Sequence, residues 1–250
     1  MSLLKEYQYP AAVLRKMTGE AFIPNGARSY VVLKDFGLTY GRIPKAANST
    51  IKAALFELLK LEVEDHSSLS RDGFWRQIPD GKADLLTGAQ LQKRHPDAFI
   101  FSFTRNPFAR VSSCYFNKIK LKQVPSSFFR RRGFARGTTF AEFVERIADY
   151  DDSSTDKHLM SQSHILSHNG KILPEFVGQV ETIDLDWERL TQLVLERGGP
   201  RLGLLGHRNK TKLTRPPDTE LFADPALVRL VRTRYQQDFE VFYPDLDCPA

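Results

Sequence analysis

The stretch PKAANST, at residues 44–50, has the composition of a loop that binds a phosphate or sulfate group. Lys45 supplies a positive charge, and the small residues Ala46 and Ala47 would let backbone N–H groups approach an anion closely. Three polar side chains follow at the start of a predicted helix and could donate further hydrogen bonds: Asn48, Ser49 and Thr50. The loop therefore predicts an anion site, although its lysine precedes the small residues instead of following them.

A second strand-to-helix junction has similar chemistry. The apolar stretch 98–104 predicts a strand that is buried on both faces, and Arg105 follows it directly. Ser113 comes two helical turns later, so a planar guanidinium and a hydroxyl could bind a second anion. Because the carboxyl ends of parallel strands lie along one edge of a sheet, the two junctions predict one ligand with two separated anionic groups.

A nucleoside triphosphate fits this pattern less well. The glycine-rich loop G-x-x-x-x-G-K-[ST] is missing, and the buried strand ends in Thr104 and Arg105 instead of an aspartate that could hold Mg²⁺. A nucleotide-binding, kinase-like protein with an unusual phosphate loop therefore stands as an alternative.

The elements that must position these residues alternate between strands and helices. Strands are predicted within 29–44, 59–65, 98–104 and 174–182, helices at 48–60, 87–96, 105–122, 138–150, 184–199 and 224–242, a loop at 66–87, and a helical or irregular segment at 155–168. This order predicts an α/β fold with a mainly parallel central sheet flanked by helices. No linker is evident, so we expect a single domain over 1–250, with 1–30 as an N-terminal extension.

Positive charge is concentrated in two segments of a chain whose net charge is +6. Residues 105–136 contain nine Lys and Arg and residues 201–216 contain five, and neither segment has an Asp or Glu. This distribution favours an anionic partner, although a solvated basic face would look the same. A rival interpretation is a nucleic-acid-binding or membrane-surface protein that uses 105–136. Phe residues are interleaved with Arg in 128–136, where they could stack on bases. That interpretation leaves the paired junctions unexplained, so nucleic acid is the less favoured partner.

The location of the protein is predicted from what the sequence lacks. Charges interrupt every short apolar run in residues 1–20, which argues against a signal peptide, and no run approaches the roughly 20 residues of a membrane span. Cys114 and Cys248 form no disulfide or metal pattern. We expect a cytoplasmic protein, for which peripheral membrane contact is compatible with the basic segments.

Four segments, in the expected order, resemble the PAPS-dependent sulfotransferases. IPKAANST looks like their Pro-Lys-x-x-x-[ST]-[ST] loop, and FSFTRNPFARVSSCYFNKI is similar to their second motif, with Arg105 and Ser113 at the same spacing. FVGQVETIDLDWERL (176–190) and RYQQDFEVFYP (234–244) resemble segments of the carbohydrate branch, sulfotransferase family 2, which includes the chondroitin 4-O-sulfotransferases.

The resemblance implies a P-loop-NTPase-like fold and PAPS as the sulfonate donor, with PAP as the product and no metal. The loop from Lys45 to Thr50 would hold the 5′-phosphosulfate, and Arg105 and Ser113 the 3′-phosphate. Lys45 would stabilise negative charge on the bridging oxygen during an in-line displacement. The segment 204–215 resembles a short stretch of the family, which implies that a further basic residue approaches the 3′-phosphate: Arg208, Lys210 or Lys212.

The acceptor, a hydroxylated small molecule, saccharide or glycolipid, needs a general base with a pKa near neutrality, so histidine is the first candidate. His66 follows the predicted strand 59–65, where related enzymes place a catalytic acid or histidine. His158 lies in DKHLMSQSHIL, which weakly resembles the D-x-H-W-x-P-Q segment of the family. His164 and His168 have metal-like spacing but no third ligand, so no metal site is expected. Both His66 and His158 stay open as the base.

Overall fold

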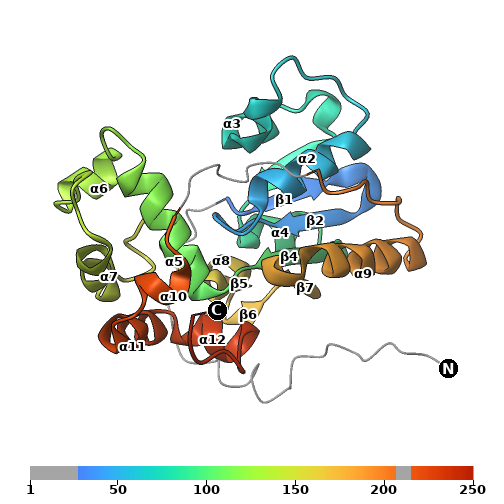
Figure 1. The fold of residues 1–250 in the computed structure, drawn as a ribbon. Coiled ribbons are helices and arrows are strands. Elements are labelled where there is room, and N and C mark those ends of the chain that lie inside the picture. The colour runs from blue at the N-terminus through green and yellow to red at the C-terminus, as the bar shows by residue number, and fades with distance from the viewer. Residues whose placement is uncertain (1–27, 207–214, 250) are drawn as a thin grey trace.

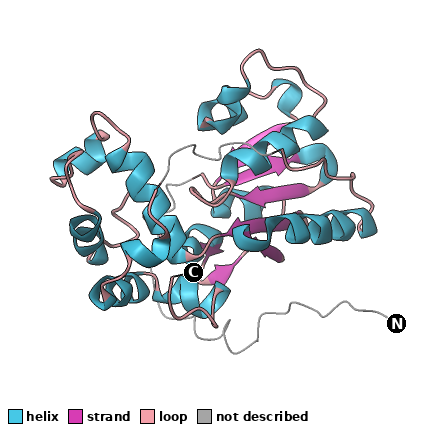
Figure 2. Ribbon diagram, in the orientation of Figure 1, coloured by secondary structure: helices cyan, strands magenta, loops and turns pink. Residues whose placement is uncertain are grey.

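The computed structural model describes residues 28–206 and 215–249, where helices surround a five-stranded sheet with the strand order β3-β1-β2-β4-β7 (Figures 1 and 2). The strands are β1 Tyr30–Leu33, β2 Leu38–Gly41, β3 Ala83–Leu86, β4 Phe99–Thr104 and β7 Phe176–Gln179. β2 pairs parallel with β4 and β4 with β7, whereas β1 pairs antiparallel with both β2 and β3. All strands of this sheet except β1 therefore run in one direction, which confirms the predicted α/β class with a mainly parallel sheet.

The helices of the described residues connect and cover these strands. They are α2 Asn48–Leu58, α3 Asp72–Trp75, α4 Gly88–Arg94, α5 Pro107–Tyr115, α6 Ser127–Arg131, α7 Phe140–Ala148, α8 Gln162–Leu166, α9 Ile183–Glu196, α10 Asp218–Leu221, α11 Pro225–Arg234 and α12 Gln236–Phe242. A two-stranded ribbon, β5 Ser167–His168 and β6 Lys171–Ile172, follows α8.

The alternation of side chains along β1 divides the core into two layers, as the period of two in a strand requires. Val31 and Leu33 point to the face that α2 and α9 cover, where they join the buried Phe101 of β4. Tyr30 and Val32 point to the opposite face, under α4. Figure 1 shows α2 and α9 on the near side of the sheet.

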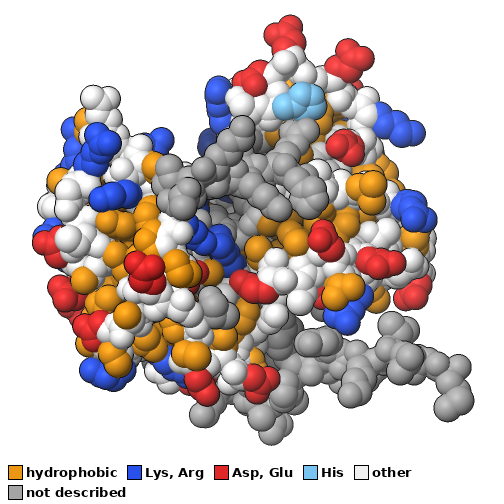
Figure 3. Space-filling view, in the orientation of Figure 1, with side chains coloured by type: hydrophobic (Ala, Val, Ile, Leu, Met, Phe, Trp, Pro, Cys, Tyr) orange, Lys and Arg blue, Asp and Glu red, His pale blue; other side chains and the backbone are white. Residues whose placement is uncertain are grey.

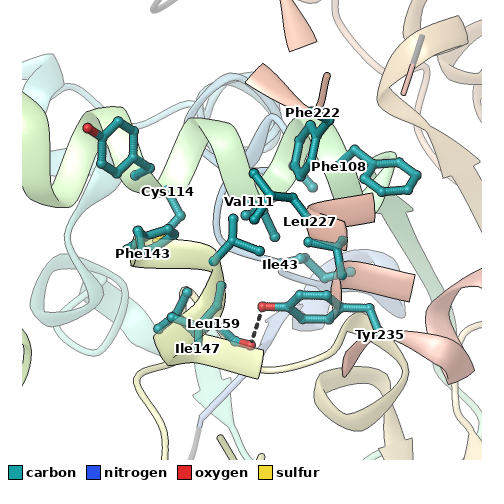
Figure 4. Packing of buried hydrophobic residues seen from close by; sticks show 14 of the residues in the cluster. Ile43, Phe108, Val111, Cys114, Phe143, Ile147, Leu159, Phe222, Leu227 and Tyr235 are labelled. Atoms are coloured by element: carbon teal, nitrogen blue, oxygen red, sulfur yellow. Dashed lines mark hydrogen bonds between the residues drawn. The ribbon is translucent and has the colours of Figure 1, made fainter. Parts of the chain in front are cut away.

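A second hydrophobic cluster lies among the helices beyond the carboxyl ends of the strands. Val111 of α5, Phe143 of α7 and Leu227 of α11 are buried in it (Figure 4). Ile43 and Ala46, from the loop after β2, are fully buried in the same cluster. The helical layer thus packs directly against the loop that carries Lys45.

Several predicted elements differ from the observed ones. The strand predicted at 59–65 is wrong: Leu59, Leu61 and Val63 pack on the core from an irregular segment. β3 lies in the segment predicted to be a loop, 66–87, and is only four residues long. The last predicted helix is two helices, α11 and α12, because the chain breaks at Tyr235.

The break at Tyr235 has a physical reason. The Tyr235 hydroxyl is buried and donates a hydrogen bond of 2.9 Å to the Leu159 carbonyl, as the dashed line in Figure 4 shows. One turn later, the buried Asp238 carboxylate accepts hydrogen bonds from the N–H groups of Gln162 (2.8 Å) and Ser163 (2.7 Å). The C-terminal helices therefore hold residues 159–163 in place, and Asp238 satisfies the N-terminus of α8.

We expect Asp238→Asn to lower the free energy of unfolding by about 1–3 kcal/mol, because an amide nitrogen would face one of these two buried N–H groups. Urea unfolding of the variant and of Glu240→Gln, an exposed position on the same helix, measures the difference. A loss no larger than that of Glu240→Gln would contradict this role for Asp238.

Candidate functional site

The two predicted anion junctions lie side by side. The register of β2 and β4 pairs Gly41 with Ser102, so the chain leaves both strands at the same edge of the sheet. The Arg105 guanidinium donates a hydrogen bond of 3.3 Å to the Lys45 carbonyl, which joins the two junctions directly. The spatial condition for a ligand that spans both junctions is therefore met.

The loop between β2 and α2 has a strained backbone. Lys45 and Ala47 both adopt positive φ, 71° and 51°, a conformation that costs non-glycine residues about 1–3 kcal/mol each. Ala47 is the N-cap of α2, and among the described residues no side chain caps this helix. The Asn48 Oδ1 atom is buried and has no hydrogen-bond partner in the described part of the chain. N–H groups at the start of a helix can bind an anion, whereas the Asn48 Oδ1 atom, which only accepts hydrogen bonds, is open to a donor group of the ligand.

Lys45 lies among other cations. Burial lowers its pKa to about 8, and although the Cys114 thiol counteracts this shift, Lys118, Arg105 and Arg110 reinforce it. Within the described residues, no carboxylate forms an ion pair with Lys45. A negatively charged ligand would remove this repulsion.

A second group of cations surrounds Arg105. Burial and the positive charge of Arg215 lower the pKa of Arg105, while Glu181 and Asp218 act in the opposite direction. The Arg215 guanidinium donates a hydrogen bond of 3.1 Å to the hydroxyl of Ser112 on α5. Ser113, the predicted ligand, is half-buried on the next position of the helix. Two guanidinium groups and the hydroxyls of α5 thus form a site suited to a phosphate.

The turn at Arg105 is held from two sides. The Gln162 side chain accepts a hydrogen bond from the Arg105 N–H (2.9 Å) and donates one to its carbonyl (2.8 Å). The Glu181 carboxylate accepts a hydrogen bond of 2.8 Å from the Asn106 N–H, and Tyr243 in turn donates to Glu181. Asn106 caps α5: its side chain accepts a hydrogen bond from the Phe108 N–H.

Arg110 connects the lysine loop to the segment that carries His158. Its buried guanidinium donates hydrogen bonds to the carbonyls of Pro44 (3.1 Å), Met160 (2.7 Å) and Lys157 (3.4 Å). Since Pro44 and Lys45 are adjacent, this one side chain fixes the distance between Lys45 and the residues around His158.

His158 forms a short pair with a carboxylate. Its Nδ1 atom lies 2.5 Å from Oδ1 of Asp156. Burial lowers the pKa of His158, assisted by Lys118, although the hydrogen bond to Asp156 opposes the shift. Lys118 also lowers the pKa of Lys45, so one positive charge influences both Lys45 and His158. With Nδ1–H directed to Asp156, a neutral His158 keeps the lone pair of Nε2 available to accept a proton.

His66 lies in a different environment. The strand whose end was expected to present it does not form, and His66, which is exposed, instead begins a 3₁₀ turn, His66–Ser70. In the described part of the chain no hydrogen bond or ion pair joins it to Lys45 or His158. The charged side chain that it influences is the neighbouring Asp65. The structure therefore brings Lys45 and Arg105 into contact, connects the segment of His158 to the lysine loop through Arg110, and leaves His66 on the surface.

Four residues of this site were not singled out from the sequence: Arg110, Asp156, Gln162 and Arg215. Asp156 precedes His158 by two residues, a spacing that could have been noticed, and Arg215 belongs to the basic segment 201–216. Gln162 stands at the Gln position of the D-x-H-W-x-P-Q segment, so the resemblance could have pointed to it. The contacts that Arg110 and Gln162 make with distant parts of the chain are not visible in a local pattern. The other basic residues expected near the 3′-phosphate, Arg208, Lys210 and Lys212, lie outside the described residues.

Figure 3 shows Lys and Arg side chains gathered in the hollow between the helical part of the molecule, on the left, and the sheet part. Among the described residues, no group of three or more His, Cys, Asp or Glu side chains is placed to hold a metal ion. Nor is any described helix long and apolar enough to cross a membrane.

This arrangement defines a class of protein: an α/β fold with two cation-rich junctions on neighbouring strand ends. Residues 28–244 match the sequence model of the sulfotransferase family, and the chain belongs to that family. The family that its motifs resemble is thereby confirmed. Comparisons with curated proteins and with solved structures gave no match.

We expect inorganic pyrophosphate at ten times its dissociation constant, added at constant ionic strength, to stabilise the protein by about 1.4 kcal/mol. At the same pyrophosphate concentration, the gain in stability should be smaller in Arg215→Ala, because this variant lacks one of the two guanidinium groups whose mutual repulsion the anion would relieve. Thermal unfolding with and without the anion measures it, with Arg229→Ala, exposed on α11, as the matched control. An equal gain in both variants would contradict a role for Arg215 in anion binding.

Proposed function

We propose that this protein transfers a sulfonate group from PAPS to a hydroxyl of a carbohydrate or glycolipid acceptor. The observation that supports it best is the direct contact between the two junctions, Arg105 against the Lys45 carbonyl. PAPS carries a phosphosulfate and a separate phosphate, so it needs two anion sites at a fixed distance. Membership of the sulfotransferase family supports the same donor.

The residues present fit this donor. The start of α2, which no described side chain caps, would bind the phosphosulfate end together with Lys45, and Asn48 would contribute the Nδ2 donor of its side chain. Arg105, Arg215 and the hydroxyls of Ser112 and Ser113 would bind the 3′-phosphate. The cations at both ends have no ion-pair partner among the described residues, so binding would replace repulsion with attraction.

The acid–base chemistry falls to His158 and Lys45. His158 would remove the proton of the acceptor hydroxyl through Nε2, while Asp156 orients its ring and stabilises the imidazolium that forms. The Lys45 ammonium would stabilise negative charge on the oxygen that leaves the sulfonate in an in-line displacement, with no covalent enzyme intermediate. PAPS, when bound, supplies the activated sulfonate.

Lys45 sets the alkaline limit of activity in this proposal. Because its pKa is about 8, the side chain loses its positive charge as the pH rises through that value, so kcat/KM for PAPS should fall there. Lys45→Arg keeps the charge and should move this limit to higher pH, whereas Lys45→Ala should be about 10²–10³-fold slower at neutral pH. A pH–rate profile with an unchanged alkaline limit in Lys45→Arg would contradict the assignment.

A matched pair of variants distinguishes His158 from His66 as the general base. We expect His158→Ala to lower kcat by about 10²–10⁴-fold and to remove the acid limb of the pH–rate profile, which lies below the usual His value of 6.5. His66→Ala should retain nearly the activity of the unaltered protein. Sulfonate transfer measured in both variants tests this, and equal losses would count against His158 as the base.

A further inference from the structure

A cavity of about 410 Å³ lies at the same edge of the sheet as the anion sites. Arg28 and Ser29 border it just before β1, Pro44 borders it from the lysine loop, and Leu85 borders it from the end of β3. The remaining walls come from α3 and from the segment around His158. The cavity thus touches the lysine loop on one side and the segment of the predicted base on the other.

The position of the cavity relates it to the acceptor. Pro44 immediately precedes Lys45, and Lys157 and Met160 flank His158. Arg110 binds the carbonyls of all three of these lining residues, which holds the two walls together. A molecule in this cavity would contact chain neighbours of Lys45 and His158, the two residues that we propose stabilise the leaving oxygen and take up the proton.

The charge of the cavity is strongly positive. Four of its lining residues are cationic, Arg28, Arg42, Arg76 and Lys157, and Asp72 is the acidic one. Asp72 is already paired: Arg42 reaches it at 2.5 Å and Lys157 at 2.8 Å. Burial opposes the ionisation of Asp72, but these two hydrogen-bonded cations hold its pKa at about 2.

After this pairing, guanidinium donors of the cavity remain available to a ligand. The Arg42 side chain is almost fully buried, and its Nε atom has no hydrogen-bond partner among the described residues. Arg76, at the end of α3, is exposed and forms no ion pair within the described chain.

We propose that this cavity binds an oxyanion group of the acceptor, a carboxylate or a sulfate ester, beside the hydroxyl that receives the sulfonate. This inference rests on the proposed function and adds a substrate class to it. Arg76 is the specificity-determining residue, because its guanidinium borders the cavity, is free of carboxylates in the described structure and can bind an oxyanion with two parallel N–H groups. Arg42, bound to Asp72, fixes the floor of the site.

The test uses saccharide pairs that differ only in charge, on protein saturated with PAP. A panel of hexuronate-containing disaccharides and their carboxyl-reduced counterparts is titrated by calorimetry, together with sulfated and unsulfated galactosides. We expect the charged member of at least one pair to bind about tenfold or more tightly than its neutral partner. The pair that responds tells whether carboxylate or sulfate is the preferred group.

Arg76→Ala should remove most of this preference while leaving PAP affinity unchanged. Arg76→Lys should keep part of it, and Arg229→Ala, outside the cavity, should keep all of it. Equal binding of both members of every pair, binding of neither member, or an undiminished preference in Arg76→Ala would overturn the proposal. Failure of PAP to bind the unaltered protein would instead refute the proposed donor, so the two failures are distinguishable.

Discussion

The site depends on positively charged side chains that lie close together, with no carboxylate in ion-pair contact with Lys45 or Arg105 among the described residues. The parallel pairing of β2 with β4 and the hydrogen bond from Arg105 to the Lys45 carbonyl bring two positively charged junctions into contact. Burial and mutual repulsion make the charged state of both side chains less favourable than in water. A ligand with two negative groups would stabilise the charged state of both side chains, so the arrangement favours binding of a doubly anionic molecule.

The rest of the fold maintains this unfavourable arrangement through buried hydrogen bonds to the backbone. Arg110 holds the lysine loop against residues 157–160, Gln162 holds the Arg105 turn, and Asp238 and Tyr235 hold the segment that contains Gln162. These contacts connect chain segments that are dozens of residues apart. They also explain why the C-terminal segment 234–244 carries a family pattern although it contributes no charge to the anion sites: its role is to position residues 159–163.

The local patterns of the sequence were sufficient for the elements that carry the two anion junctions. The apolar spacing that predicts the helix at 48–60 and the buried run that predicts β4 depend on neighbours in sequence, and both elements are observed. The adjacency of Lys45 and Arg105 followed from the parallel sheet. By contrast, the apolar alternation at 59–65 was misleading, because those side chains pack against the core without a strand partner. The pairing of His158 with Asp156 is local and could have been read from their spacing, whereas the role of Arg110 depends on contacts with distant parts of the chain, which sequence spacing alone does not encode.

The central claim is that neighbouring strand ends bind opposite ends of one ligand. Calorimetric affinities of PAP and of adenosine 5′-phosphate, which lacks the 3′-phosphate, test it most directly in the unaltered protein and in Arg105→Ala. We expect PAP to bind at least about tenfold more tightly than adenosine 5′-phosphate, a difference of about 1.4 kcal/mol, and this advantage to disappear in Arg105→Ala. If Arg105→Ala weakened both ligands by the same factor, the second strand end would not be the 3′-phosphate site and the account would be wrong.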